Sequence, residues 1–295
     1  MLGGVPTCVD SIIVVDDAST DGTAAILDSI DDPRVDIVTH EKNQGVGGAI
    51  VSGYEAFLET KSDVCVVMAG DDQMDANDLP NLVGPIVSGS ADYVKGNRLN
   101  RSDVKEVMPR DRLFGNLIFT IITKWASGYW HVVDSQCGFT AISRQVLERL
   151  DLDRVYSRYG FPNDFLIRLN IIDANVEDVD VRAIYGEEES GIRPFQAVPR
   201  ICLLLIRGFF MRMWQRYVIR DFHPLVLLYL FGGILLTVGV AMGVSITYEK
   251  YQHGVVATPA TVILCALCLI VGFQSTLFAM MFDMLHNQKL RGRRS

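Results

Sequence analysis

Two acidic clusters, each directly after a short apolar run, are the residues of this sequence best suited to chemistry. Asp16 and Asp17 follow the apolar run 11–15 and precede a helix-like segment. The second cluster follows the run 64–68 and consists of Asp71, Asp72, Gln73 and Asp75. Open α/β sheets present ligand-binding groups at the carboxyl ends of their strands. The pattern therefore predicts two binding loops of this kind.

The chemistry expected of the two clusters differs. Hard divalent cations prefer oxygen ligands, and a diphosphate takes such a cation as its counter-charge, which suits the cluster after Met68. Asp17 is suited to accept hydrogen bonds from a ribose or a base. The structural alternative is that Asp16, Asp17 or Ser19 caps the helix that starts near Asp21. That alternative uses one acid and leaves its neighbour unexplained.

Three other polar features are candidates for a binding or catalytic role. Asp134 precedes a turn and an apolar run, and the alternative for it is a turn-forming Asp. Asp164 lies in the first turn of a predicted helix, where a negative charge is favourable without any further function. The acidic loop 185–194, which contains Arg193, fits a lid and a solvated turn equally well. The five histidines show no metal-ligand spacing.

The order of the elements predicts the fold class. Through about residue 185, short apolar runs alternate with helical patterns, which indicates an α/β domain with a largely parallel sheet. Strands are expected at 11–15, 35–39, 64–68, 93–96, 138–142 and 176–184. Helices are expected at 20–30, 46–59, 76–87, 112–127, 144–150 and 162–172.

The charge is unevenly divided along the chain. Residues 1–199 contain 17 basic and 32 acidic side chains, a formal net charge of −15, whereas residues 200–295 contain 10 and 3, giving +7. An acidic body lacks the basic stripe that neutralises nucleic-acid phosphates, so no nucleic-acid partner is expected. A basic, apolar tail is typical of association with a lipid bilayer. The six cysteines show no disulfide framework.

Three segments of that tail have membrane character. Residues 198–220 place five arginines among large apolar side chains, which predicts an amphipathic interfacial helix, with an ordinary buried helix as the alternative. Residues 225–244 and 261–282 are uncharged and long enough to cross the ~30 Å hydrocarbon layer. Basic residues flank the pair on both outer sides. By the positive-inside rule, the expectation is a multi-pass protein of the cell membrane with its acidic body and both termini cytoplasmic.

Six segments in consistent order resemble the family-2 glycosyltransferases of GT-A fold, specifically the branch of the dolichol-phosphate mannose and glucose synthases. They are VDDASTDGT (15–23), NQGVGGA (43–49), MAGDDQMD (68–75), KGNR (95–98), DSQCGF (134–139) and YGEEESGIRP (185–194). The resemblance covers about residues 9–200. It implies a GT-A (Rossmann-like) catalytic domain over 1–197, an amphipathic juxtamembrane helix over 198–220, and a transmembrane hairpin with a basic cytoplasmic tail over 221–295.

The resemblance also implies roles for single residues. Asp17, with Asp16 beside it, would contact the nucleoside of the donor. Asp71 and Gln73 would hold Mg²⁺ or Mn²⁺ against the donor diphosphate. Asp134 would lie near the acceptor in a catalytic role, with Asp164 as a second candidate for that role. Arg98 and Arg193 would bind phosphate groups of the nucleotide sugar.

The chain departs from the family pattern in two ways. The metal motif is usually Asp-x-Asp, and its first position here is Ala69. Family members also usually begin with a strand that ends in a Pro-x-Tyr-Asn-Glu-like motif, whereas this sequence starts at what resembles the run into the second strand. Because that first strand lies within the family's sheet, its loss would leave backbone groups unpaired. The expectation is that the recorded start codon lies downstream of the true one.

The activity implied is the inverting transfer of a hexose from a nucleotide-diphosphate sugar, of the GDP-mannose or UDP-glucose class. The acceptor would be polyprenyl or dolichyl phosphate at the cytosolic face of the bilayer. One alternative is a catalytically silent membrane scaffold of the same fold, which Ala69 favours. A second is a polysaccharide synthase, but its usual Gln-x-x-Arg-Trp motif is not supplied by residues 196–200 or 214–216.

Overall fold

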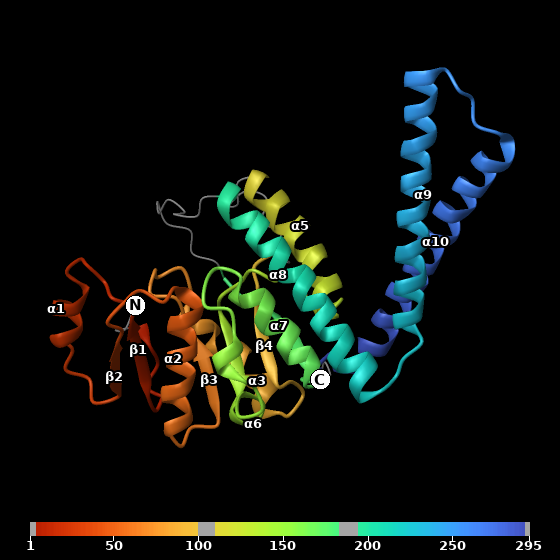
Figure 1. Cartoon of the computed structure of the whole chain (residues 1–295). Coiled ribbons are helices and arrows are strands. Elements are labelled where there is room, and N and C mark those ends of the chain that lie inside the picture. Colours follow the sequence, from red (N-terminus) through yellow and green to blue (C-terminus); the bar gives the residue numbers. More distant parts are fainter. Residues whose placement is uncertain (1–3, 100–109, 183–193, 293–295) are drawn as a thin grey trace. The chain divides into compact units, whose positions relative to one another are not determined.

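The computed structural model describes residues 4–99, 110–182 and 194–292 (Figure 1), with the backbone alone for 110–117 and 194–197. The strands are β1 (Ile12–Asp16), β2 (Val35–Thr39), β3 (Val64–Val67), β4 (Tyr93–Asn97), β5 (Thr140–Ser143) and β6 (Val176–Asp180). The α-helices are α1 (Thr23–Asp28), α2 (Val46–Glu59), α3 (Leu79–Val87), α5 (Arg110–Ser127), α6 (Arg144–Leu147), α7 (Phe161–Ile171), α8 (Pro194–Trp214), α9 (Leu225–His253) and α10 (Pro259–Asn287). Shorter helical segments are η2 (Ala76–Asp78), η3 (Leu152–Arg154), the π-helix η4 (Gln215–Arg220) and η5 (Gln288–Leu290).

These elements form two compact units. The sheet unit comprises the described residues of 1–212 and 289–295, and the hairpin unit comprises residues 213–288. The chain therefore leaves the sheet unit after Arg212 and returns to it at Lys289.

The strands of the sheet unit form two sheets. β1 pairs in parallel with β2, and the second sheet has the order β3-β5-β4-β6. β4 and β6 are parallel, whereas β5 runs antiparallel to both β3 and β4. The predicted α/β class is confirmed. Among the described residues, β1 and β3 each keep one edge without a strand partner.

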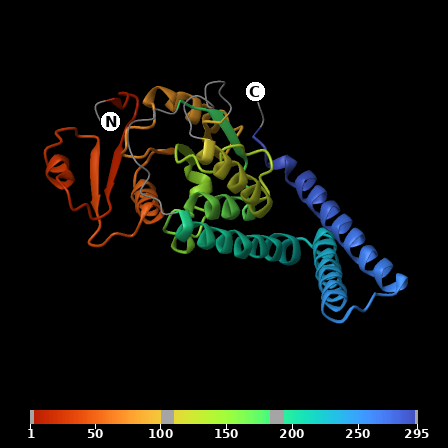
Figure 2. The same cartoon turned by 90° about the horizontal axis from the view of Figure 1, so that it is seen from above.

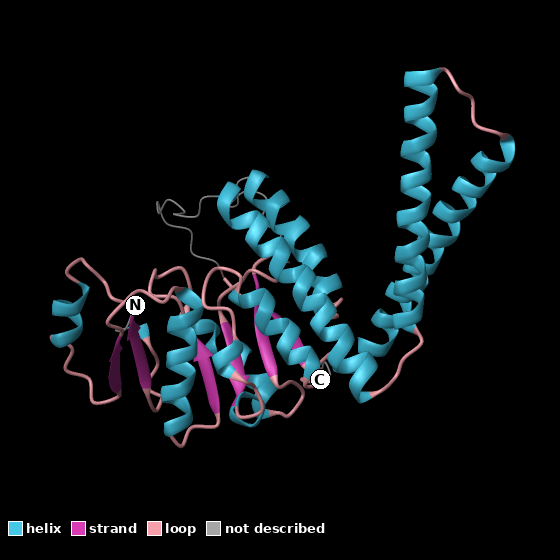
Figure 3. Cartoon of the chain, in the orientation of Figure 1, coloured by secondary structure: helices cyan, strands magenta, loops and turns pink. Residues whose placement is uncertain are grey.

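Successive side chains of each strand point to opposite faces of the second sheet, and both faces are packed. Cys65 and Val67 of β3 face one apolar cluster, to which α2 and α7 contribute. Val64 and Val66 face the other cluster, to which α3 contributes. Figure 3 shows the strands lying between these helices.

Helix α2 joins the two sheets, because it packs against both β1 and β3. Arg144, directly after β5, holds the carboxyl end of this helix. Its guanidinium donates hydrogen bonds of 2.8–3.1 Å to four carbonyl oxygens, those of Phe57, Leu58, Thr60 and Ser62. The last carbonyls of a helix have no partner within the helix, so a cation there is well placed.

Helix α8 occupies most of the predicted interfacial segment and has two different faces. On one face, Phe209 stacks on Trp125 of α5 with ring centroids 4.0 Å apart. The fully buried Arg212 donates from Nε to the carbonyl of Ala126 at 2.8 Å, in the last turn of α5. The exposed apolar side chains of the helix include Leu203, Ile206 and Phe210.

The hairpin unit is dominated by α9 and α10, both long and apolar enough to cross a membrane. Most of their residues are exposed, unlike those of a core helix in a soluble protein. The two helices pack side by side (Figure 2) where glycines meet. A Cβ on Gly232 would lie 2.9 Å from the carbonyl oxygen of Gly272, and a Cβ on Gly272 would lie 2.8 Å from the amide nitrogen of Leu236. The glycines thus allow the two backbones to approach closely.

Candidate active site

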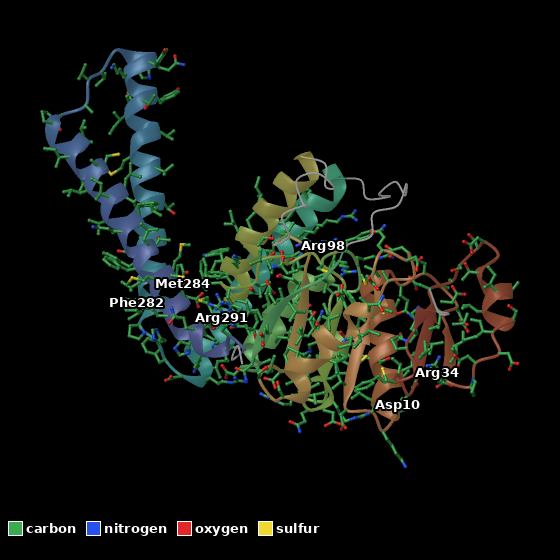
Figure 4. All side chains as sticks on the ribbon, turned by 180° about the vertical axis from the view of Figure 1, so that it is seen from behind. Asp10, Arg34, Arg98, Phe282, Met284 and Arg291 are labelled. Atoms are coloured by element: carbon green, nitrogen blue, oxygen red, sulfur yellow. The ribbon has the colours of Figure 1, made fainter. Side chains whose placement is uncertain are left out.

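Sheet topology brings three of the predicted site segments to one edge. Because β3 and β4 are both antiparallel to β5, they are parallel to each other. The loops after β3 and β4 therefore emerge at the same edge as the loop that enters β5. These loops carry Asp71, Arg98 and Asp134, and Figure 4 labels Arg98 at this edge.

Asp134 and Arg98 form a two-point ion pair. Arg98 donates from Nε to Oδ2 at 2.8 Å and from Nη2 to Oδ1 at 3.2 Å. The backbone amides of Arg98 and Gln136 donate to the same carboxylate at 3.3 and 3.2 Å. The Asp134 side chain has no exposed surface, whereas 23% of the Arg98 side chain is exposed. The pair thus fixes the carboxylate and leaves part of a cation facing outward, where an anion can bind.

Two further ionisable side chains, one of them fully buried, contact this loop. The Lys95 ammonium on β4 donates to the carbonyl of Cys137 at 2.5 Å, and burial lowers the pKa of this lysine. Asp178 is the register partner of Lys95 on β6, and its carboxylate accepts the amide of Val133 at 2.5 Å. Burial, aided by Asp134, raises the pKa of Asp178 to about 6, against the opposing effects of Val133, Lys95 and Lys124. β4 and β6 therefore hold both ends of the segment 133–137.

Gln136 connects the same loop to α7. Its side-chain amide donates to the oxygens of Ser135 and Asn163, each at 2.9 Å. Asp164, the next residue, instead accepts from the amide of Tyr156 at 3.0 Å and from Arg168 Nε at 2.7 Å. The contact between the two motifs is thus made by Asn163, and the catalytic role of Asp164 stays a prediction.

The first acidic pair follows β1 in the other sheet. Asp16 accepts the amide of Ser19 at 3.0 Å and closes a turn in which Ala18 has φ 59°. Asp17 reaches across to the start of α2, where its two carboxylate oxygens accept the amides of Gln44 and Gly45, each at 2.7 Å. Asp16 thus takes the turn-forming role, while Asp17 orders a loop.

Asp17 also binds His40, which donates from Nδ1 at 2.8 Å. Burial raises the pKa of Asp17, but the hydrogen bonds from His40, Gln44 and Gly45 outweigh burial and hold it below its usual value. Beside this cluster is an open hollow of about 500 Å³, lined by Thr39, His40, Glu41, Lys42 and Gln44. A nucleoside contact for Asp17 stays a prediction, and this hollow is the adjacent space for one.

The second acidic loop follows β3 and has a tight conformation. Asp71 accepts the amide of Gln73 at 3.2 Å, and Asp72 has φ 57°. Asp75 accepts the amide of Asn77 at 2.9 Å and caps η2. In the described part of the chain, no three His, Cys, Asp or Glu side chains are grouped to hold a metal ion.

The remaining donor set still suits one kind of metal site. Asp71 offers carboxylate oxygens and Gln73 an amide oxygen, the hard ligands that Mg²⁺ and Mn²⁺ prefer. Mg²⁺ is commonly held by one or two carboxylates together with the phosphates of a substrate. The residues present therefore fit a cation that binds together with a diphosphate, and assignment of Asp71 and Gln73 as its ligands stays a prediction.

The sequence alone does not identify every residue of this site. Arg193 lies outside the described residues. His40, Lys95 and Asp178 were given no role from sequence, because their partners lie on other elements. Lys95 carried the one usable signal, because it stands inside a predicted strand, where a buried ammonium group needs an acceptor.

Comparisons with known proteins bear on the family of this chain. Residues 6–151 match the sequence profile described as Glycosyl transferase family 2. The UDP-N-acetylglucosamine–dolichyl-phosphate N-acetylglucosaminyltransferase of Methanococcus voltae is 31% identical over 192 residues, covering 60% of this chain and 76% of that protein. The polyprenol monophosphomannose synthase of Mycolicibacterium smegmatis is 30% identical over 191 residues, covering 61% and 68%.

Among solved structures, the glucosyl-3-phosphoglycerate synthase of Mycobacterium tuberculosis, crystallised with Mn²⁺ and UDP, matches with a TM-score of 0.48 and 22% identity over 69% of each chain. The profile match and the extent of the two sequence alignments decide the family. The chain belongs to Glycosyl transferase family 2 and is a glycosyltransferase.

Proposed function

We propose that this enzyme transfers a hexose from a nucleotide-diphosphate sugar to a polyprenyl phosphate, such as dolichyl phosphate, with inversion at the anomeric carbon. The relatives from Methanococcus voltae and Mycolicibacterium smegmatis, whose names specify dolichyl-phosphate and polyprenol acceptors, support this class of acceptor. They bear different sugars in their names, so they leave the sugar of this enzyme open.

The observation that carries the proposal is the course of the chain between its two units. The family 2 domain lies in the sheet unit, and the two membrane-length helices lie between Arg212 and Lys289, which both belong to that unit. An even number of spans returns the chain to the side from which it left. This supports a catalytic domain held at one membrane face, where a water-soluble donor meets a lipid whose phosphate head is in water. The basic flanks favour the cytosolic face.

On the donor side, Asp17 and the hollow beside it would bind the nucleoside, with Asp16 shaping the turn. Asp71 and Gln73 would hold Mg²⁺ or Mn²⁺ next to the diphosphate. The cation, when bound, would neutralise charge on the departing nucleotide diphosphate.

The exposed part of Arg98, together with Arg193, would bind phosphate groups of the nucleotide sugar. The acceptor is itself a phosphate. A phosphate monoester has a second pKa of ~6 and is largely dianionic at neutral pH, so it needs little deprotonation before it attacks. Asp134, whose carboxylate is already engaged by Arg98, would therefore orient the acceptor rather than act as a strong base. Asp134→Asn should lower turnover at every pH, and full recovery at high pH would contradict an orienting role.

The test is incubation of membranes that contain the enzyme with radiolabelled UDP-glucose, GDP-mannose and UDP-N-acetylglucosamine in turn. Label from one of the three is expected in an organic-soluble lipid. Asp71→Ala should abolish this transfer, whereas Asp36→Ala, on the exposed face of β2, should not change it. Transfer by Asp71→Ala at the wild-type rate would refute the assignment of the donor site.

A catalytically silent scaffold is the second candidate, and Ala69 at the first position of the usual metal motif is the observation that favours it. In that case no donor would be consumed, by transfer or by hydrolysis. Release of free nucleotide from each donor, measured on the same membranes, separates the two candidates.

A further inference from the structure

The chain that returns from the hairpin unit docks on the edge of the second sheet. Arg291, labelled in Figure 4, forms a parallel β-bridge with Val176, the first residue of β6. The amide of Gly292 donates to the carbonyl oxygen of Val176 at 3.0 Å. Leu290, 3% exposed, belongs to the apolar cluster that also contains Val132 and Val176. The docked segment Lys289–Gly292 is thus built into the sheet unit.

The loop that leads to Asp134 lies against the same strand, with three regularly spaced contacts. Tyr129 Oη donates to the carbonyl of Ala174 at 2.7 Å, His131 Nε2 to that of Val176 at 2.9 Å, and the amide of Val133 to Asp178 at 2.5 Å. Alternate residues of the loop (129, 131 and 133) therefore contact alternate residues in and just before β6 (174, 176 and 178). The next residue after this ladder is Asp134.

The docked segment and the loop bind the same acceptor, the one in the middle of the three loop contacts. The carbonyl oxygen of Val176 accepts both the His131 ring and the Gly292 amide, as its two lone pairs allow. Burial, aided by Arg291 and Lys124, lowers the pKa of His131 to about 4, although the bond to Val176 opposes this. The ring is therefore neutral near pH 7, with its proton on Nε2, where it is donated to Val176.

Gly292 packs so closely against Glu177 of β6 that one added carbon atom would disturb the docked segment. A Cβ added to Gly292 would lie 2.6 Å from Oε2 and 2.8 Å from Cβ of Glu177. The carboxylate oxygen can move away, but the Cβ is fixed to the backbone of β6. An alanine at position 292 therefore has to displace the segment or the strand.

We propose that Lys289–Gly292 is a positioning element of the acceptor side, which sets the loop 129–134 through Val176 and so places Asp134. This rests on the acceptor-side role of Asp134 under the proposed function. The segment begins directly after Gln288, the last residue of the hairpin unit, so the second apolar helix is covalently continuous with a part of the active-site support. The hairpin would then contribute to the geometry of catalysis as well as to anchoring.

The test compares Gly292→Ala with the matched change Gly84→Ala in α3, where an added Cβ meets nothing within 4 Å. Full-length protein is used in lipid nanodiscs. Amide hydrogen exchange in 129–134 should become about tenfold faster in Gly292→Ala, while exchange in α3 stays at the wild-type rate. A chain that ends after Gln288 should show the same increase, and a chain that ends after Gly292 should not.

Activity supplies the second readout, with a short-chain polyprenyl phosphate as acceptor. Gly292→Ala should lower kcat/KM for this acceptor by about tenfold or more, with the donor KM unchanged, because small misplacements of a catalytic group cost rate. Wild-type exchange in 129–134 for both Gly292→Ala and the chain ending at Gln288 would overturn the proposal. So would an equal increase in exchange across the sheet unit, which would mark a general loss of stability. The hydrogen-exchange measurement does not require activity, so it can be made even if the wild type transfers no sugar. Failure of this proposal is therefore distinguishable from failure of the proposed function.

Discussion

At the scale of the residue, Lys95 and Asp178 place a cation and an acid in register inside the sheet. Both bind the loop that carries Asp134, one through the carbonyl of Cys137 and the other through the amide of Val133. Under the proposed function, neither contact involves the groups that react. Substitutions of Lys95 or Asp178 are therefore expected to change the stability of the fold and the order of the loop. They should change the rate of the reaction only through the position of Asp134.

Asp178→Asn should change how stability depends on pH. The folded protein raises the pKa of Asp178 from 3.8 to about 6, so it binds the proton more tightly than the unfolded chain does. The stability gained from this group is complete below the unfolded pKa and is lost as pH rises through about 6. An asparagine keeps an oxygen for the Val133 amide and does not titrate. The melting temperature of the variant, measured from pH 4 to 7.5, should lack this decline.

The control for that measurement is Asp36→Asn, which removes an exposed carboxyl group on β2. Its pH profile should follow that of the wild type. Superimposable profiles for Asp178→Asn and the wild type would show that this carboxyl group does not titrate as stated.

The residues of the candidate site were predictable to different degrees. The sequence identified Asp134 and Arg98 separately, through motifs, but not as an ion pair. Lys95 and Asp178 could not be matched, because their proximity depends on the register of β4 against β6 over a long sequence separation. Likewise, His40 shows no metal-ligand spacing and gains a partner only when β2 is placed beside β1.

At the scale of the element, α2 is the connection between two separate sheets, and it is held at both ends by side chains from elsewhere. Asp17 from the end of β1 binds the amides at its start, and Arg144 binds the carbonyls at its end. Opposite charges thus stand at the two poles of the helix, each at the end whose partial charge it complements.

Arg144→Met should destabilise the sheet unit by about 2–3 kcal/mol, because it removes charge-assisted hydrogen bonds from carbonyls that are only partly accessible to water. The free energy of unfolding from urea titration is the measurement. Arg154→Met is the matched change at a side chain that is 76% exposed, and it should cost less than ~0.5 kcal/mol. Equal losses in the two variants would mean that Arg144 does not support α2.

Most elements were predictable because their signals are local. Short apolar runs located the strands near their observed positions, and the helical pattern predicted α2 with the observed bounds. The antiparallel direction of β5 and the division into two sheets were not predicted, since pairing depends on contacts far apart in the sequence.

At the scale of the whole molecule, the chain passes through the hairpin unit and returns, so its topology is open to direct measurement. Residues 254–258 connect α9 to α10 and include Val256, which is 78% exposed. A hairpin across a membrane would place this connection on the side opposite the catalytic domain.

Val256→Cys should react with a membrane-impermeant maleimide added outside intact cells. Cys8, an exposed cysteine of the sheet unit, is the internal control and should react only after permeabilisation. Labelling of Val256→Cys that also requires permeabilisation would contradict the proposed orientation or the crossing itself.

The glycine contacts between α9 and α10 have a consequence for the lipid environment. Where Gly232 and Gly272 meet, a Cβ on either glycine would lie within 3 Å of the backbone of the other helix, so the close contact depends on both glycines. In a bilayer thicker or thinner than their apolar length, the two helices would therefore tilt together, because independent tilting would separate this contact.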